Sequence, residues 1–161
     1  MESDSADEFI LESSAFKYGQ EIPDEFTAHG GNRVPPLSWS HMPPDTEELV
    51  LIMQDPDAPK DPPYVHWILY KIPKDDNPID PARAKIGKNS HGEISYFGPE
   101  PPPNTGFHRY YFLLLALDRE FDLKEGLSRD EILDIIRSNI LGEAELMGKY
   151  QYHETQTASG H

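Results

Sequence analysis

The chain has 161 residues with 29 acidic and 14 basic side chains, and it contains no cysteine. This length fits a single domain that buries an adequate core without disulfides or a structural metal. The formal net charge of −15 repels phosphate backbones and anionic lipid surfaces, so we expect no nucleic-acid partner. The longest apolar run, residues 110–117, is far shorter than the ~20 residues that span a bilayer. The acidic start is unlike a signal peptide, and we expect a cytoplasmic protein without an integral membrane segment.

The two ends of the chain differ in composition from its middle. Residues 1–8 are acidic with no bulky apolar side chain after Met1, and residues 153–161 are small and polar. Such segments cannot bury enough apolar surface to fold, which predicts two disordered tails. No repeat or linker composition interrupts the remainder, so we expect a single domain over residues 9–152.

The predicted elements are mostly short strands, because 16 prolines and 11 glycines interrupt the chain frequently. Residues 9–12 and 37–40 are weaker strand candidates. The apolar runs 48–54 and 64–72 predict two buried strands, and the Pro-rich segment between them suggests a hairpin with a long loop. Residues 109–117 are apolar on both faces, which predicts a third strand at the centre of a sheet.

One helix is predicted, over residues 129–140. Ser128 and Glu131 have the spacing of a capping box, and Gly142 is expected to end the helix. One helical face carries Ile132, Ile135, Ile136 and Ile140, which predicts core packing. Residues 143–152 alternate loosely and predict a last strand. This pattern is typical of a mainly β protein, a two-sheet antiparallel β-sandwich with one or a few peripheral α-helices.

The segment Asp55-Pro56-Asp57-Ala58-Pro59 is the most unusual in the chain, because prolines restrict the backbone around two carboxylates. It follows a predicted buried strand. In an antiparallel pair, the end of this strand and the start of the next lie on the same rim, which brings Asp55 close to His66. His108 precedes the third strand and joins the same rim if that strand lies beside the second.

The residue types at such a rim indicate which ligands it can bind. Neighbouring carboxylates favour a protonated imidazole, and two imidazoles with a tyrosine hydroxyl can donate hydrogen bonds to an anion. The carboxylates can hold an ammonium group, so the site suits a zwitterion such as a phosphate monoester that carries an amine. Trp67, Phe107 and Tyr111 are candidates for its apolar walls.

Other interpretations of the same residues stay open. Taken alone, the two aspartates are typical of a turn-capping loop, His66 of a half-buried strand residue, and Arg109 of a brace for a loop or carboxylate. Asp55, Asp57, His66 and His108 could instead hold a divalent cation in a metal-dependent phosphomonoester hydrolase. Neither GxSxG nor HExxH is present. A third hypothesis is an interaction protein whose acidic surface engages a basic partner.

Several spaced motifs resemble the signature of the phosphatidylethanolamine-binding proteins. They are Asp55 to Pro59, His66-Trp67, Gly98-Pro99, Pro101-Pro102, and the run from Gly106 to Tyr110. Residues 16–39 and 143–150 resemble the opening and the end of the family's bacterial and archaeal branch, the Raf kinase inhibitor-like proteins. The resemblance therefore covers nearly everything between the two tails.

This resemblance implies two antiparallel sheets, peripheral helices and a small cavity at one rim that takes phosphate or a phospholipid head group. It implies a binding protein, with regulation of a kinase or protease partner as a role described for some members, and it implies no cofactor. Enzymatic activity and oligomeric state stay undecided. The ligand-binding residues that it implies are Asp55, Asp57, Pro59, His66, Pro101, Pro102, His108 and Tyr110.

The chain departs from the family pattern at two positions near the predicted cavity. Ala28-His29-Gly30 stands where prokaryotic relatives usually have Cys-Asp-Gly, and Glu100 occupies a place often held by a small or apolar residue. Glu100 could weaken binding of anions or pair with the amine of a zwitterion. The chain also lacks a clear equivalent of the C-terminal helix of animal members.

Overall fold

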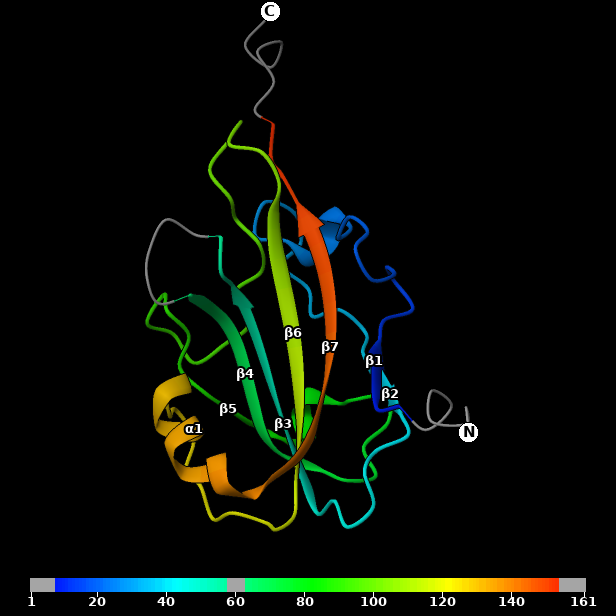
Figure 1. The fold of residues 1–161 in the computed structure, drawn as a ribbon. Coiled ribbons are helices and arrows are strands. Elements are labelled where there is room, and N and C mark those ends of the chain that lie inside the picture. The colour runs from blue at the N-terminus through cyan, green and yellow to red at the C-terminus, as the bar shows by residue number, and fades with distance from the viewer. Residues whose placement is uncertain (1–7, 58–62, 154–161) are drawn as a thin grey trace, which may run out of the picture.

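The computed structural model describes residues 8–57 and 63–153 and contains two antiparallel sheets (Figure 1). The smaller sheet pairs β1 (Ile10–Glu12) with β2 (Ser38–Ser40). The larger sheet has the order β5-β4-β3-β6-β7 and comprises β3 (Glu48–Asp55), β4 (Tyr64–Pro73), β5 (Lys85–Ile86), β6 (His108–Leu117) and β7 (Ile140–Tyr150). The mainly β fold class with two antiparallel sheets is confirmed. The predicted tails, apart from Glu8 and His153, lie outside the described residues.

Both faces of the larger sheet are covered along its central strand, β3. N-terminal segments cover one face and contribute Leu11, Phe16, Ile22, Phe26 and Leu37. The other face packs against α1 (Arg129–Ile136) and the loop before it, which contribute Phe121, Leu123, Ile132 and Ile136. Burial on two sides explains why the predicted strands are apolar runs without alternation.

The pairing of β6 differs from the arrangement considered from the sequence. β6 pairs with β3 rather than with β4, and β3 also pairs with β4 as the predicted long-looped hairpin. Both neighbours are antiparallel to β3. The end of β3 and the starts of β4 and β6 therefore meet at one end of the sheet, the upper end in Figure 1.

A β-bulge in β4 places His66. Met53 lies opposite Trp67 and Gln54 lies opposite Val65, so His66 is the extra residue between two paired positions. A bulge bends the strand and redirects a side chain. Both His66 and its neighbour Trp67 are buried as a result.

The predicted helix is correct at its start and wrong at its end. Ser128 Oγ accepts from Glu131 N at 3.2 Å and Glu131 Oε1 accepts from Ser128 N at 2.9 Å, which completes the capping box. After Ile136 the chain forms a 3₁₀ turn (Arg137–Asn139) and then enters β7 at Ile140. Pairing of β7 along the full length of β6 overrides the helical pattern, because backbone groups of an extended ladder are satisfied there.

The isoleucine face and the predicted helix stop are corrected accordingly. Ile132 and Ile136 are fully buried, whereas Ile135 and Ile140 remain 44% and 36% exposed. Gly142 lies inside β7, where an added Cβ would come within 3.1 Å of Pro43 Cγ. Two further 3₁₀ turns occur at Asp24–Phe26 and Pro81–Arg83. Within residues 8–57 and 63–153, no helix has the length and apolar character that crossing a membrane requires.

Candidate functional site

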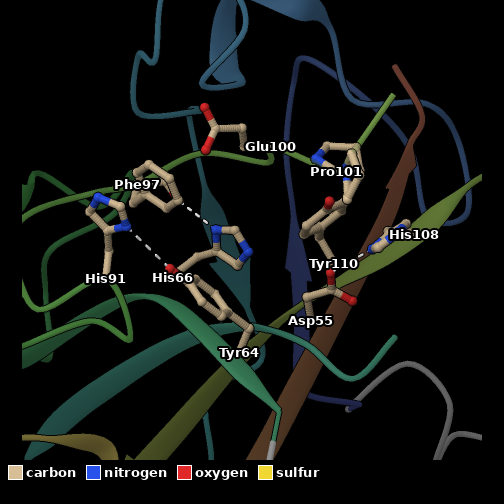
Figure 2. A pocket seen from close by; sticks show the side chains of 10 residues that line it. Asp55, Tyr64, His66, His91, Phe97, Glu100, Pro101, His108 and Tyr110 are labelled. Carbon is tan, nitrogen blue, oxygen red and sulfur yellow. Dashed lines mark hydrogen bonds and ion pairs between the residues drawn. The ribbon is translucent and has the colours of Figure 1, made fainter. Parts of the chain in front are cut away.

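A pocket of about 230 Å³ opens at the end of the larger sheet where β3, β4 and β6 meet (Figure 2). The register brings Asp55 opposite Tyr64, and Gln54 opposite Tyr111, so Asp55 lies next to Tyr110. The pocket is lined by Asp55, Tyr64, His66, His91, Phe97, Glu100, Pro101, Pro102, His108 and Tyr110. Six of the eight residues predicted for ligand binding are in this lining. Asp57 is not part of it, and Pro59 lies outside the described residues.

The buried side chains of Asp55 and His108 lie at ion-pair distance from each other at the base of the pocket. His108 Nδ1 lies 2.9 Å from Asp55 Oδ2, and the Asp57 backbone N–H donates to Asp55 Oδ1 at 2.7 Å. The carboxylate accepts the proton on Nδ1, which leaves Nε2 as the ring nitrogen that can meet a ligand. His108 reaches Asp55 through the β3–β6 pairing, although the condition considered from the sequence, that the third strand lies beside the second, is not met.

Burial favours the neutral form of His66, against the expectation that nearby carboxylates favour a protonated imidazole. Burial lowers the pKa of His66, and this effect outweighs the opposing influence of the Phe97 carbonyl and of the Asp55 charge. His66 Nδ1 lies 2.6 Å from Phe97 O and must therefore donate to it. The other ring nitrogen faces Tyr110 in Figure 2 and acts as an acceptor.

Tyr110 supplies a neutral hydroxyl. Burial raises its pKa, and the charges of Asp55 and Asp57 add to that effect. The ring packs edge-on against His66 with centroids 5.3 Å apart and stacks loosely with His108 at 6.4 Å. A phenol held in this way keeps its proton at neutral pH and can donate it to an anion.

Aromatic side chains that sequence reasoning missed form one wall of the pocket. Phe97 stacks on His91 at 4.5 Å and on His66 at 5.8 Å, and the Tyr64 hydroxyl lies 3.4 Å from His91 Nδ1. Tyr64 could have been found, because it lies two residues before His66 at the start of the predicted strand. His91 and Phe97 belong to the long connection between β5 and β6. This connection has no strand alternation from which the direction of a side chain could be predicted.

The prediction that Trp67, Phe107 and Tyr111 form apolar walls of the pocket is wrong. Trp67 is buried in the core against Tyr96 at 5.1 Å. Phe107 is 44% exposed and lies under Lys149 Nζ, and Tyr111 lies beside the Arg109 guanidinium. Successive strand residues face opposite sides of a sheet, so Phe107 and Tyr111 alternate with the pocket residues His108 and Tyr110.

Asp57 is held outside the pocket by Arg109. The guanidinium donates from Nε to Oδ2 and from Nη2 to Oδ1, each at 2.8 Å, and the Arg109 backbone N–H donates to Oδ2 at 2.9 Å. These bonds, led by that of the side chain, lower the pKa of Asp57. The interpretation of Arg109 as a brace for a carboxylate is confirmed, and the brace ties the turn after β3 to the start of β6.

The Ala28-His29-Gly30 segment contacts the lip of the pocket that Glu100, Pro101 and Pro102 form. His29 Nε2 lies 3.3 Å from Pro101 O, and the His29 ring stacks on Tyr152 at 3.7 Å. The Ala28 backbone N–H donates to Pro99 O at 2.8 Å. His29 thus joins the lip to the last described residues of the chain.

Of the four residues proposed for a metal-dependent hydrolase, Asp55, His66 and His108 line the pocket and Asp57 does not. Asp57 is engaged by Arg109, and His66 donates to a backbone carbonyl. In the part of the chain that the structure describes, no three His, Cys, Asp or Glu side chains form a group that could hold a metal ion.

The sequence profile of the phosphatidylethanolamine-binding proteins matches residues 12–151. The chain belongs to this family. A UPF0098 protein of Methanothermobacter thermautotrophicus is 38% identical over 150 residues, which cover 88% of this chain and 97% of the relative. A UPF0098 protein of Chlamydia trachomatis is 40% identical over 148 residues, with the same coverage of both chains.

Solved structures of the family have the same fold. The phosphatidylethanolamine-binding protein homologue CT736 of Chlamydia trachomatis superposes with a TM-score of 0.82 at 36% identity, over 90% of this chain and 98% of that one. YbcL of E. coli, described as a member of the mammalian family, also has a TM-score of 0.82, at 26% identity over 89% of this chain and 98% of that one. The family resemblance inferred from the motifs is thereby confirmed.

Proposed function

We propose that this protein binds small phosphate-like anions in the rim pocket, with a phosphomonoester or a phosphoethanolamine head group as the ligand class. The observation that carries the proposal is the Asp55–His108 pair beside Tyr110, inside a pocket that is otherwise lined by aromatic rings, two prolines and Glu100. We assign ligand binding to Asp55, His66, Pro101, Pro102, His108 and Tyr110. Asp57 is assigned to shaping the loop at its side, and Pro59 stays a prediction of the family resemblance.

The proposed contacts follow from the donors available. A phosphate oxygen accepts from the Tyr110 hydroxyl. Because His108 Nδ1–H already donates to Asp55, His108 Nε2 can donate to a second phosphate oxygen only when the ring is an imidazolium, for which Asp55 would be the counter-charge. His66 presents an acceptor instead and suits a protonated phosphate oxygen or an ammonium hydrogen. Burial of His66, His108 and Tyr110 strengthens each contact with the ligand, because water does not compete for their polar atoms.

Glu100 gives the pocket an acidic lip and favours a zwitterion over a simple anion. Its carboxylate lines the opening across from Asp55 in Figure 2. An ammonium group at the mouth of the pocket would be attracted to it, whereas inorganic phosphate would be repelled. We therefore expect O-phosphoethanolamine to bind more tightly than phosphate. Regulation of a kinase or protease partner would be a consequence of such binding.

The family supports this assignment, since its name records binding of phosphatidylethanolamine. The test is a calorimetric titration of wild type, His108→Ala and Tyr110→Phe with O-phosphoethanolamine and with inorganic phosphate. His41→Asn is the matched control, because His41 is exposed and has a φ of 58° that asparagine tolerates. We expect saturable binding by wild type and the control, and a loss of about tenfold or more in both pocket variants. Equal binding by all four proteins would overturn the proposal.

A further inference from the structure

A second concave surface lies on the side of the molecule, between β1 and the outer strand β7. This groove of about 680 Å³ shares no residue with the rim pocket. Its floor is apolar, with the buried side chains of Leu11, Phe16, Ala144 and Leu146. Its walls carry the exposed carboxylates of Glu8, Glu12, Glu143 and Glu145, and Lys17 is the one basic residue in its lining.

Among residues 8–57 and 63–153, no backbone group pairs with the outer edge of β7 along this groove. Farther along the strand, Gly19 N donates to Met147 O at 2.7 Å and Lys149 N donates to Gln20 O at 3.0 Å. Odd-numbered residues of β7 therefore direct their backbone groups away from β6 in this part of the strand. Glu143 and Glu145 have the same parity, and within residues 8–57 and 63–153 their outward backbone groups have no hydrogen-bond partner.

β1 lies alongside this open edge without pairing to it. The two strands belong to different sheets, and β1 appears beside β7 in Figure 1. The length from Glu143 to Leu146, before Met147 O accepts from Gly19 N, offers a short template, roughly 10 Å long, for about four residues of an extended peptide. Added strands of this kind gain affinity from main-chain hydrogen bonds and specificity from alternate side chains.

We propose that this groove binds an extended basic peptide segment of a partner protein as an additional strand on β7. Charge complementarity selects the occupant, because four carboxylates and one lysine surround the open edge. The apolar floor beneath the acidic walls favours lysine or arginine alternating with small apolar residues. A second copy of this chain is disfavoured, since antiparallel β7 edges would bring Glu143 and Glu145 against the same acids of the other copy.

The test uses a short fluorescein-labelled peptide of alternating lysine and valine, with binding followed by fluorescence anisotropy at low salt. The charge-reversal variant is Glu143→Lys/Glu145→Lys. Its matched control is Glu120→Lys/Asp122→Lys, which alters net charge equally at exposed positions outside the groove. We expect the groove variant to weaken binding about tenfold and the control about twofold or less. Equal weakening would assign the binding to overall charge and overturn the proposal.

Three further measurements distinguish strand addition to β7 from other modes of peptide binding. The same peptide with N-methylated valines cannot donate from those backbone positions, and we expect it to bind at least about tenfold more weakly; unchanged affinity would refute strand addition. The single variant Glu143→Lys keeps the hydrogen bond from Tyr18 to Glu145 and should weaken binding in the same direction. Sedimentation velocity should show no dimer that depends on Glu143; such a dimer would assign the edge to self-pairing and overturn the proposal.

Discussion

Asp55 and Asp57 are two residues apart, yet they belong to different regions of the rim. The Asp55 side chain is 4% exposed and pairs with an imidazole inside the pocket. The Asp57 side chain is 29% exposed and pairs with a guanidinium on the outer surface. Both are aspartates at a strand end, so residue type and spacing do not distinguish them.

The boundary of β3 explains the difference. Asp55 is the last residue of the strand, and its position opposite Tyr64 fixes its side chain on the pocket face. Asp57 follows in a turn, where its carboxylate reaches the start of β6 from outside. One carboxylate therefore orients the His108 imidazole inside the pocket, while the other fastens the turn after β3 to the start of β6.

The largest effect is expected from removing Asp55. Asp55→Ala leaves His108 buried without its partner and frees the Asp57 backbone N–H, so we expect a loss of about 2–4 kcal/mol in the free energy of unfolding. Asp57→Ala should cost about 1 kcal/mol or less, because its ion pair is partly solvated. Urea denaturation of the two variants makes the comparison, and equal losses would contradict the different roles of the two aspartates.

An intermediate effect is expected from the pH dependence of His66. Because its folded pKa is lowered, the neutral ring stabilises the fold above the unfolded value of about 6.5, and this contribution is lost as the pH falls toward the folded pKa. His66→Gln should remove up to about 1.4 kcal/mol per pH unit from the slope of stability below pH ~6.5. Urea titrations across that range measure it; identical slopes in wild type and variant would show that His66 is not held neutral.

The smallest effect is expected at the outer surface. Arg109→Ala removes the bonds that lower the pKa of Asp57, so the destabilisation should exist above the ordinary aspartate value of about 3.9 and vanish as the pH falls below it. It should also shrink with added salt. Thermal melts at several pH values and salt concentrations test both dependences. A destabilisation that persists at low pH would indicate that Arg109 acts through packing instead.

Much of the fold follows from the sequence because its strands are strongly apolar. The runs 48–54, 64–72 and 109–117 match β3, β4 and β6 closely, and the weaker candidates became β1 and β2. The end of α1 could not be predicted, since the isoleucine spacing continues through Ile140 while the chain already pairs with β6. Long-range sheet pairing decided that boundary, and local periodicity carries no information about it.

The site was predictable where it depends on strand ends and unpredictable where it depends on loops and solvation. Asp55, His66 and His108 follow from antiparallel pairing, although the bulge that turns His66 to the pocket has no sequence signal. The neutral state of His66 depends on burial that only the folded chain defines. His91 and Phe97 come from an irregular connection, so their place in the wall was out of reach.

The rim pocket, rather than the rest of the protein surface, is the proposed anion site. The most direct test is a long-range ¹H–¹⁵N spectrum of the histidine imidazoles during titration with O-phosphoethanolamine. We predict saturable shifts for His66 and His108, which line the pocket, and none for the exposed His41. Shifts at His41 with unchanged His66 and His108 signals would contradict the account.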